Sequence, residues 1–461
     1  MKKSIAFYPT PNFIVKEMIK ISGIKKNQNI LETGFGECAF IEELYNQNFK
    51  NIFGVEYSNE FYSKAKNNFS KISNNLYHED YLSFQPKFKV EHIIGNPPYI
   101  NSDNLDKEVK ENIRTITQSG EGNIYYAFII KSIQILEYGG SLTYILPYDF
   151  FYNTYASKLR EYMIQNGYFT DIVDFGESKV FENAAPETII FRYIKNTSKK
   201  PPHKVKVKKI KQRYSLKEIT NKWNDIFEEF EMENFKDNKL WSLSSIKKEE
   251  GTPLKDIEGV KISVGIVNGF ESAFHVENLK PFNKEERVNY IKGFIKNKNR
   301  NSLKENNEII SNYENYIWIP NNKFKTEEEL KTKLPNIYNH LLSFKEEMLK
   351  RKLSKTKLWF DYLAIRNKET FDENKNKLKI HVPGLTRQEE QWFFISKDDN
   401  YVGGDLLTIT CEDENKLKII FNYLNSDRFT SYYKEVGAKK GKRTVFTQKI
   451  LSEIIIPKDI L

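Results

Sequence analysis

The sequence predicts an α/β protein in which a doubly wound, largely parallel sheet is followed by a second domain of mixed α and β structure. Strand-like and helix-like segments alternate through the first half of the 461 residues. After about Asn238 this rhythm fades, and the chain becomes irregular and rich in Asn, Lys and aromatic residues. The length exceeds one ordinary domain, so we predict two domains, at 1–235 and 236–461.

The elements of the first half follow from hydrophobic periodicity and from the turn residues between the periodic segments. We expect helices at 11–21, 40–44, 59–69, 125–136 and 157–165. We expect strands at 29–33, 52–56, 92–95, 141–146, 170–175 and 188–193, with a Gly139-Gly140 turn before the strand at 141. In the second half, a helix at 416–425 is readable from its period. Sheets of this kind bind ligands beyond the carboxyl ends of their strands.

The composition favours a polyanionic partner. The net charge is +10, and 33 Phe and 27 Tyr offer stacking surfaces; a coding bias toward Lys and Asn is the alternative explanation. The basic segment 196–213 contains the alternation Lys-Val-Lys-Val-Lys, which favours a charged edge strand over a phosphate-contacting rim. A second basic segment is predicted to contact phosphates, with a solvated turn as its alternative: Lys439, Lys440, Lys442 and Arg443.

Several classes of protein are disfavoured. Only two cysteines occur, far apart, and the six histidines show no ligand spacing, so we expect neither disulfides nor a bound metal. The amino-terminal residues are polar, and no run approaches the roughly 18 apolar residues that a membrane span needs. We therefore expect a soluble, cytoplasmic protein without membrane contact.

The most informative stretch is Asn96-Pro97-Pro98-Tyr99, which directly follows the apolar run 90–95. The prolines fix two backbone φ angles, so the Asn96 side-chain oxygen and the Pro97 carbonyl can point the same way. Such a pair can accept both hydrogens of one exocyclic amino group. Tyr99 adds a flat face on which a planar base can stack.

Carboxylates precede this turn at the ends of successive predicted strands. Glu32 leads into a turn with Gly34 and Gly36, whose missing side chains let the backbone approach a ligand. Glu56 ends the next strand, at a distance along the chain that suits hydrogen bonding to ribose hydroxyls. Asp80 follows a third segment, where a carboxylate can accept from an adenine amino group. Together they predict a nucleoside site.

This ordered series resembles the motifs of gamma-class DNA adenine-N6 methyltransferases of restriction-modification systems, in particular the Taq-type subgroup. The resemblance rests on Tyr8-Pro9-Thr10-Pro11, 31–36, Gly54-Val55-Glu56, Asp80-Tyr81 and 95–99, and continues more loosely through 123–128, 139–147, 423–426 and 450–457. It implies a Rossmann-like methyltransferase domain, then a DNA target recognition domain, with S-adenosylmethionine as methyl donor.

The resemblance also implies individual roles. Thr10 and Pro11 would close over the cofactor, and Glu32 and Gly34 would line its methionine end. Gly36 and Asn96 would be further cofactor contacts. Glu56 would hold the ribose, and Asp80 with Tyr81 would contact the adenine. Asn96 and Pro97 would accept the target amino hydrogens, Tyr99 would stack on the flipped base and Phe128 would pack against it, although Phe128 also fits the buried face of a helix. The glycine turn at 33–38 differs in detail from other members.

The expected activity is site-specific transfer of a methyl group to N6 of an adenine flipped from duplex DNA, by positioning rather than by a general base. Asparagine at the first motif position favours adenine N6 over cytosine N4. The alternatives are an RNA base methyltransferase, a release-factor glutamine methyltransferase and a non-catalytic DNA-recognition subunit.

Only seven residues precede Tyr8, so we expect methylation without cleavage, by a monomer on DNA. A separately encoded restriction endonuclease is compatible with the sequence.

Overall fold

The computed structural model describes residues 8–118, 122–181, 187–196, 204–210, 212–238, 240–246, 249–302, 312–387, 392–440 and 443–461. The chain forms two compact units, Met1–Ile246 and Lys247–Leu461. The first unit extends past the predicted boundary at residue 235. Trp241 stacks on Phe235 with ring centroids 4.4 Å apart, and its backbone N–H donates to the Phe151 carbonyl at 3.0 Å.

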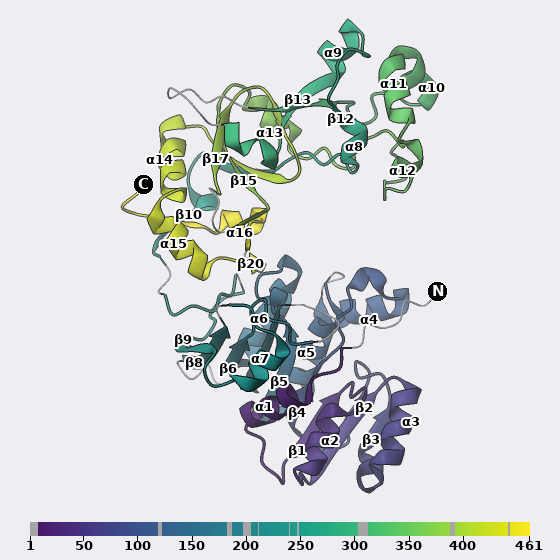
Figure 1. The fold of residues 1–461 in the computed structure, drawn as a ribbon, viewed down its shortest axis with the longest axis vertical. Coiled ribbons are helices and arrows are strands. Elements are labelled where there is room, and N and C mark those ends of the chain that lie inside the picture. The colour runs from purple at the N-terminus through teal and green to yellow at the C-terminus, as the bar shows by residue number, and fades with distance from the viewer. Residues whose placement is uncertain are drawn as a thin grey trace. The chain divides into compact units, whose positions relative to one another are not determined.

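A nine-stranded sheet forms the centre of unit 1 (Figure 1). Its strand order is β3-β2-β1-β4-β5-β7-β6-β8-β9. The strands are β1 (Asn29–Thr33), β2 (Asn51–Glu56), β3 (Leu76–His78), β4 (Val90–Gly95), β5 (Leu136–Pro147), β6 (Gly167–Asp174), β7 (Thr188–Lys195), β8 (Lys204–Ile210) and β9 (Phe227–Glu233).

The sheet is parallel from β3 to β5. On the other side, β7 runs antiparallel to both β5 and β6, β8 is parallel to β6, and β9 is antiparallel to β8. The α/β prediction is therefore confirmed. The chain leaves β1 toward β2 and β3 and returns to β4 on the other side of β1. The carboxyl ends of β1 and β4 thus mark the point where the strand order reverses.

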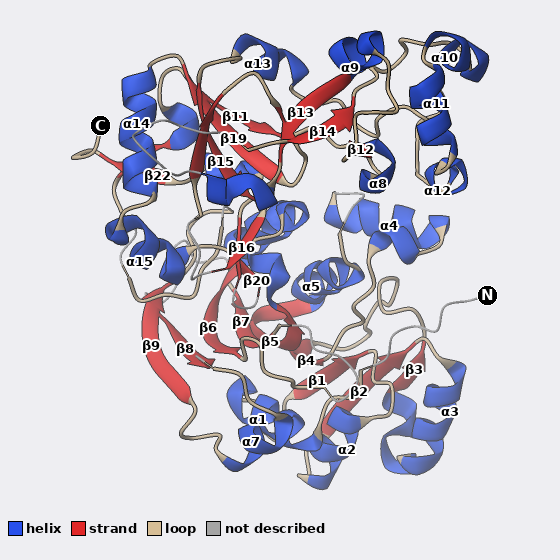
Figure 2. Ribbon diagram, turned by 45° about the horizontal axis from the view of Figure 1, so that its top comes forward, coloured by secondary structure: helices blue, strands red, loops and turns tan. Residues whose placement is uncertain are grey.

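Helices cover both faces of this sheet (Figure 2). One core contains side chains of α1 (Asn12–Ser22), α2 (Ala39–Asn46), α3 (Asn59–Asn68) and α7 (Leu216–Asn221). The core on the other face contains side chains of α4 (Lys107–Thr117), α5 (Ile124–Ile135) and α6 (Ser157–Asn166). Ile93 and Ile94, adjacent in β4, fall in different cores because successive strand side chains point to opposite faces.

The basic strand β8 is not an edge strand, so that prediction is wrong. It lies between β6 and β9, and β9 forms the edge. The lysine alternation instead matches an acidic alternation on β9: Lys204 pairs with Glu231 at 3.4 Å and Lys208 with Glu229 at 2.6 Å. Lys208 and Glu229 are directly opposite each other and Lys204 and Glu231 are diagonal neighbours, and opposite charges at such positions favour this register. Several of the lysines that suggested a phosphate rim therefore face carboxylates.

The Gly139-Gly140 turn occurs within β5 rather than before it. The pairing with β4 passes from Val90↔Leu136 to His92↔Ser141, so residues 137–140 lie outside the regular register. Gly139 has φ +80°, in the left-handed region that favours glycine.

Unit 2 is built from four small sheets, with orders β10-β22, β11-β19-β15-β17, β12-β14-β13-β18 and β16-β21-β20. Their strands are β10 (Gly251–Pro253), β11 (Val260–Val264), β12 (His275–Val276), β13 (Ile291–Ile295), β14 (Glu314–Ile317), β15 (Leu378–Pro383), β16 (Leu385–Arg387), β17 (Phe394–Lys397), β18 (Tyr401–Val402), β19 (Leu406–Cys411), β20 (Lys439–Lys440), β21 (Arg443–Val445) and β22 (Ile455–Pro457).

The helices of unit 2 are short. They are α8 (Glu271–Phe274), α9 (Lys284–Tyr290), α10 (Glu327–Lys333), α11 (Pro335–Leu342), α12 (Lys345–Leu349), α13 (Lys368–Glu373), α14 (Glu414–Leu424), α15 (Asp427–Val436) and α16 (Gln448–Ser452). The helix predicted at 416–425 corresponds to α14. Across the described ranges of both units, none of the helices has the length and apolar character to cross a membrane.

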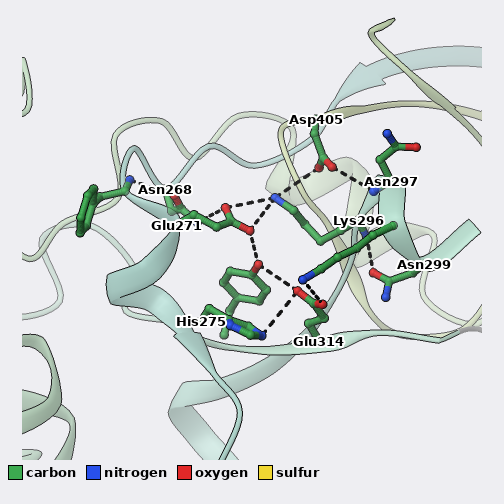
Figure 3. Close-up of polar contacts among 11 residues, drawn as sticks. Asn268, Glu271, His275, Lys296, Asn297, Asn299, Glu314 and Asp405 are labelled. Atoms are coloured by element: carbon green, nitrogen blue, oxygen red, sulfur yellow. Dashed lines mark hydrogen bonds and ion pairs between the residues drawn. The ribbon is translucent and has the colours of Figure 1, made fainter. Parts of the chain in front are cut away.

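A polar network joins several loops of unit 2 (Figure 3). Lys296 lies between two carboxylates, with its Nζ 3.0 Å from Glu271 and 3.3 Å from Asp405. The Tyr316 hydroxyl donates to Glu271, and the Asn268 side-chain amide donates to the same carboxylate at 3.1 Å. The network fixes the segment 268–271 against β13 and β14.

Candidate active site

A cavity of about 580 Å³ opens in unit 1 beyond the carboxyl ends of β1, β2 and β4. Most of the predicted site residues line it: Thr10, Glu32, Gly34, Gly36, Glu56, Asp80, Tyr81, Asn96, Pro97 and Phe128. Two predicted residues lie just outside the lining. Pro11 is the N-cap of α1, where its carbonyl accepts from the Val15 N–H at 3.0 Å, and Tyr99 lies behind Asn96.

The turn after β1 brings bare backbone to the cavity wall. Gly34 has φ +72°, and a Cβ added there would meet nothing within 4 Å, so the space beside it is open. Its N–H donates to the Val55 carbonyl at 2.8 Å, which ties the turn to β2. A ligand can therefore approach this peptide more closely than a side chain would allow.

Glu56 ends β2 with both carboxylate oxygens engaged by backbone N–H groups. Oε2 accepts from Gly36 at 2.8 Å, and Oε1 accepts from Ser58 at 2.7 Å. A carboxylate offers about four acceptor sites, so each oxygen retains capacity for one more donor. The side chain is thus held in a fixed orientation and can still receive two hydroxyl groups.

Glu32 is the more deeply buried of the two glutamates, with 2% of its surface exposed. Its Oε2 accepts from the Ile41 N–H in the first turn of α2 at 3.0 Å. Burial raises the pKa of this carboxyl well above its ordinary value, and the charge of Glu56 adds to that rise. Glu32 therefore fixes the start of α2 beside the cavity.

The far end of the cavity holds Asp80 and Tyr81, directly after β3. Asp80 Oδ1 accepts from the Leu82 N–H at 3.0 Å, which orients the carboxylate. The Tyr81 ring is buried and lies 5.0 Å from the Phe128 ring, centroid to centroid. This end presents a carboxylate next to aromatic faces, an arrangement suited to a purine.

Buried hydroxyl groups connect this end to β1. The Tyr81 hydroxyl lies 2.7 Å from Ser132 Oγ on α5, and Ser132 Oγ lies 2.8 Å from the Tyr144 hydroxyl on β5. The Tyr144 hydroxyl in turn lies 2.6 Å from Thr33 Oγ1 at the end of β1. The chain of hydrogen bonds holds the strand ends and α5 in register beneath the cavity.

Asn96 is held at both ends of its side-chain amide. Nδ2 donates to the Tyr8 carbonyl at 3.0 Å and to Thr10 Oγ1 at 3.1 Å, and Oδ1 accepts from the Tyr99 hydroxyl at 2.5 Å. A carbonyl only accepts, so the contact with Tyr8 fixes which end of the amide is nitrogen. Oδ1 is therefore the acceptor end of the amide, and with the Tyr99 hydroxyl as one donor it retains capacity for a second.

Other aromatic rings contact the Tyr99 ring, for which the sequence predicted a flat face open to a base. The Tyr8 ring stacks on it at 5.8 Å between centroids with 26° between the planes. Phe181 and Tyr125 meet it edge-on at 6.3 and 6.1 Å. Its hydroxyl also lies 2.9 Å from the Ile145 carbonyl, and burial raises the pKa of this hydroxyl well above its ordinary value. Tyr99 is thus locked in place by the segment that begins at Tyr8.

Sequence reasoning missed several residues of the cavity wall. Phe35, Tyr57, Phe61 and Glu79 also line it. Tyr57 follows Glu56 directly and is 71% exposed. An aromatic residue immediately beyond an acidic strand end is a signal that could have identified it.

The predicted basic contacts of unit 2 fall on one small sheet. Lys439 and Lys440 form β20 and Arg443 begins β21, whereas Lys442 lies outside the described residues. Arg443 is paired in register with Arg387 of β16, which sequence reasoning did not select. Two cationic side chains therefore occupy opposed positions in this sheet, and both residues are exposed.

Comparison with known proteins supports this description. Residues 19–181 match the family of Eco57I restriction-modification methylases. The type II methyltransferase M.MjaIV of Methanocaldococcus jannaschii is 38% identical over 206 residues, which cover 44% of this chain and 66% of that protein. The type II methyltransferase M.HindII of Haemophilus influenzae is 27% identical over 98% of this chain and 89% of its own length.

Solved structures agree on the fold of the whole chain. The type IIL restriction-modification enzyme MmeI, determined with DNA, matches 96% of this chain and 64% of its own with a TM-score of 0.59 at 11% identity. The enzyme of the DrdV–DNA complex matches 88% of this chain and 49% of its own with a TM-score of 0.51 at 13% identity. Residues 19–181 thus match the Eco57I restriction-modification methylases, and the chain is an S-adenosylmethionine-dependent methyltransferase similar to type II methyltransferases.

Proposed function

We propose that the chain methylates N6 of adenine at specific sites in duplex DNA, as the modification enzyme of a restriction-modification system. The observation that carries the proposal is that Asn96 and Pro97 both line the cavity, and that the contacts of Asn96 identify Oδ1 as the acceptor end of its amide. Two acceptors side by side suit an amino group that bears two hydrogens. The type II names of the relatives support the assignment to restriction-modification.

The residues of the cavity fit the cofactor. When bound, S-adenosylmethionine supplies a methyl group on a positively charged sulfur. Glu56 would accept from both ribose hydroxyls, since each of its oxygens retains acceptor capacity. Asp80 would accept from the adenine amino group, beside the ring of Tyr81. The open space at Gly34 would admit the methionine end, where the carboxyl of Glu32 lies.

Asn96 and Pro97 would activate the target nitrogen without a general base. The lone pair of an adenine amino group is delocalised into the ring, which makes the nitrogen a poor nucleophile. If Asn96 Oδ1 and the Pro97 carbonyl each accept one amino hydrogen, the nitrogen moves toward tetrahedral geometry and its lone pair turns toward the methyl group. Such positioning contributes several kcal/mol, on the order of 10²–10⁴ in rate. The proton leaves after the new bond forms.

Tyr99 and Tyr8 would shape the place of the flipped base. Flipping costs a few kcal/mol, and stacking on one aromatic ring returns about 1–3 kcal/mol per base. Because the Tyr8 ring covers one face of Tyr99, a base that stacks there has to part the two rings. Phe128 lines the same cavity and would pack against the edge of the flipped base.

Unit 2 would recognise the DNA sequence. The paired positions Arg387 and Arg443 would bind phosphate on the exposed side of their sheet, together with the predicted contacts Lys439, Lys440 and Lys442. Cleavage is not part of the proposal, and a separately encoded endonuclease would supply it.

The proposal is tested by incubation of the protein with tritiated S-adenosylmethionine and, in parallel, duplex DNA, RNA or a release factor. We expect label in DNA alone, and none when Asn96→Ala replaces the parent. Label that appears only in RNA or in the release factor would contradict the proposal, and magnesium-dependent cutting of unmethylated DNA would overturn the expectation of methylation without cleavage.

A further inference from the structure

We propose that the loop 350–357 of unit 2 binds the DNA phosphate backbone through Lys350, Lys352 and Lys355. The inference rests on the proposed DNA substrate and adds a contact surface that is separate from the β16-β21-β20 sheet. It follows from three features of the loop: its charge, its attachment to the core of unit 2, and the absence of carboxylate partners for its outward lysines.

The charge of this loop has one sign. From Met348 to Phe360 the chain contains no acidic residue. The same stretch carries the cations Lys350, Arg351, Lys352, Lys355 and Lys357. A polyanion that approaches the loop therefore meets no carboxylate within it.

Two of these cations attach the loop to the core. The Arg351 guanidinium donates to the carbonyls of Met348 at 3.1 Å, Asn268 at 2.7 Å and Trp359. The Lys357 ammonium donates to the Tyr362 carbonyl at 2.9 Å. Charge-assisted hydrogen bonds to backbone oxygens at both ends hold the loop in one conformation.

The surface to which Arg351 attaches is itself fixed. Asn268 belongs to the polar network around Glu271 and Lys296 (Figure 3). Gly269 has φ +86°, and a Cβ at this position would lie 2.8 Å from the Leu363 Cβ, so the backbone here is closely packed. The loop therefore rests on a rigid base and loses little conformational entropy on binding.

Lys350, Lys352 and Lys355 are exposed, and no carboxylate pairs with them in the part of the chain that the structure describes. Three other exposed lysines of unit 2 are paired within their helices. Lys331 lies 3.8 Å from Glu328, Lys333 lies 3.2 Å from Glu329, and Lys418 lies 3.0 Å from Glu414. The three loop lysines can bind phosphate without first breaking an ion pair.

The test compares two triple variants of the full chain that change the net charge equally. K350Q/K352Q/K355Q removes the loop charges, and K331Q/K333Q/K418Q removes paired lysines elsewhere in unit 2. Binding of a labelled random-sequence DNA duplex is measured by anisotropy over a range of salt concentrations. Each phosphate contact contributes about 0.9 to the slope of log K against log salt, so the loop variant should lose about 2.7 of slope and at least about tenfold in affinity.

The inference is overturned if the salt slopes of the loop variant and the paired-lysine variant differ by less than about 0.9, the equivalent of one phosphate contact. Cofactor binding and the thermal midpoint should match the parent in both variants, which shows that folding is intact. If the parent itself binds no DNA, the proposed function and this inference both fail; if the parent binds DNA and the two variants behave alike, only this inference fails.

Discussion

The two units hold their polar groups in different ways, and the difference fits the proposal that unit 1 performs the chemistry and unit 2 recognises DNA. In unit 1, one sheet brings Glu32, Glu56 and Asn96 to the ends of neighbouring strands, and all three line one cavity. In unit 2, buried charges hold loops instead. Lys379 donates to three backbone carbonyls at 2.8–3.3 Å, and Glu286 accepts from the Asn336 and Ile337 N–H groups at the start of α11.

A continuous sheet holds reacting groups at positions as precise as hydrogen bonding requires. Loops attached individually to a small core can change in sequence without disturbing one another. The following experiments test whether lesions in unit 1 affect cofactor and chemistry while lesions in unit 2 affect DNA.

Asn96→Ala should have the largest effect. It removes the proposed acceptor of an amino hydrogen, and we expect the rate of transfer to fall by about 10²–10³, or roughly 3–4 kcal/mol, with little change in affinity for cofactor or DNA. Single-turnover methylation with saturating cofactor measures this rate. A rate within about tenfold of the parent, roughly 1.4 kcal/mol, would show that the hydrogen-bond role is wrong.

Glu56→Gln should weaken cofactor binding and leave DNA binding unchanged. Hydrogen bonds to a charged group contribute about 1.5–3 kcal/mol, so the dissociation constant for S-adenosylmethionine should rise roughly 10- to 150-fold. Calorimetric titration measures it directly. Glu60→Gln is the matched control, because Glu60 is an exposed glutamate in α3 paired with Lys64. Equal affinities of the two variants would contradict the assignment of Glu56 to the ribose.

Replacement of both Arg387 and Arg443 by Gln should weaken DNA binding and leave cofactor binding unchanged. Loss of two phosphate contacts lowers the salt slope of DNA binding by about 1.8 and the affinity by about tenfold, while cofactor affinity stays at the parent value. A variant with the same change in net charge, Arg114→Gln with Lys64→Gln, serves as the control. If both variants lose affinity equally, net charge rather than this sheet explains the effect.

A smaller effect concerns the stability of the fold at acid pH, because each unit contains a buried histidine with a lowered pKa. Burial lowers the pKa of His381 in β15 to about 3 and that of His92 in β4 to about 4, so both are neutral when folded. The unfolded state, with a histidine pKa near 6.5, binds more protons below that pH. The contribution of these two histidines to the free energy of unfolding is therefore constant above about pH 6.5. Between that pH and the folded pKa of each histidine, the free energy of unfolding falls by up to about 1.4 kcal/mol per pH unit per histidine.

Hydrogen exchange of peptides that cover β15 and β19 measures this effect at pH 7 and pH 5, after correction for intrinsic rates. We expect protection in unit 2 to fall by about 2 kcal/mol in the parent and by less in His381→Gln. His381 lies 3.0 Å from Thr408 Oγ1 and 2.8 Å from Ser396 Oγ, so the variant is less protected overall. An unchanged pH response in the variant would remove His381 as the cause.

Local sequence patterns predicted unit 1 well because its elements repeat with clear periods. The strand expected at 29–33 corresponds to β1 at Asn29–Thr33, and the acidic residues fell at strand ends, where parallel strands share one edge. The turn after β4 was readable because proline restricts its own backbone and Asn96 precedes it.

Contacts between distant segments were not readable in the same way. The Asn96 side chain donates to the Tyr8 carbonyl, and the Tyr8 ring covers a face of Tyr99; both depend on how the amino-terminal segment packs. The pairing of Arg387 with Arg443 depends on the register of a small sheet. The acidic strand β9 covers β8 because of cross-strand charge, which local hydrophobic periods do not encode.

The most direct test of the central claim is sequencing of DNA modifications in a host that expresses the chain, with Asn96→Ala as the control. The account predicts N6-methyladenine in one defined sequence context and none of it in the control. Methylated cytosine, modification without a sequence context, or an unmodified genome would contradict it.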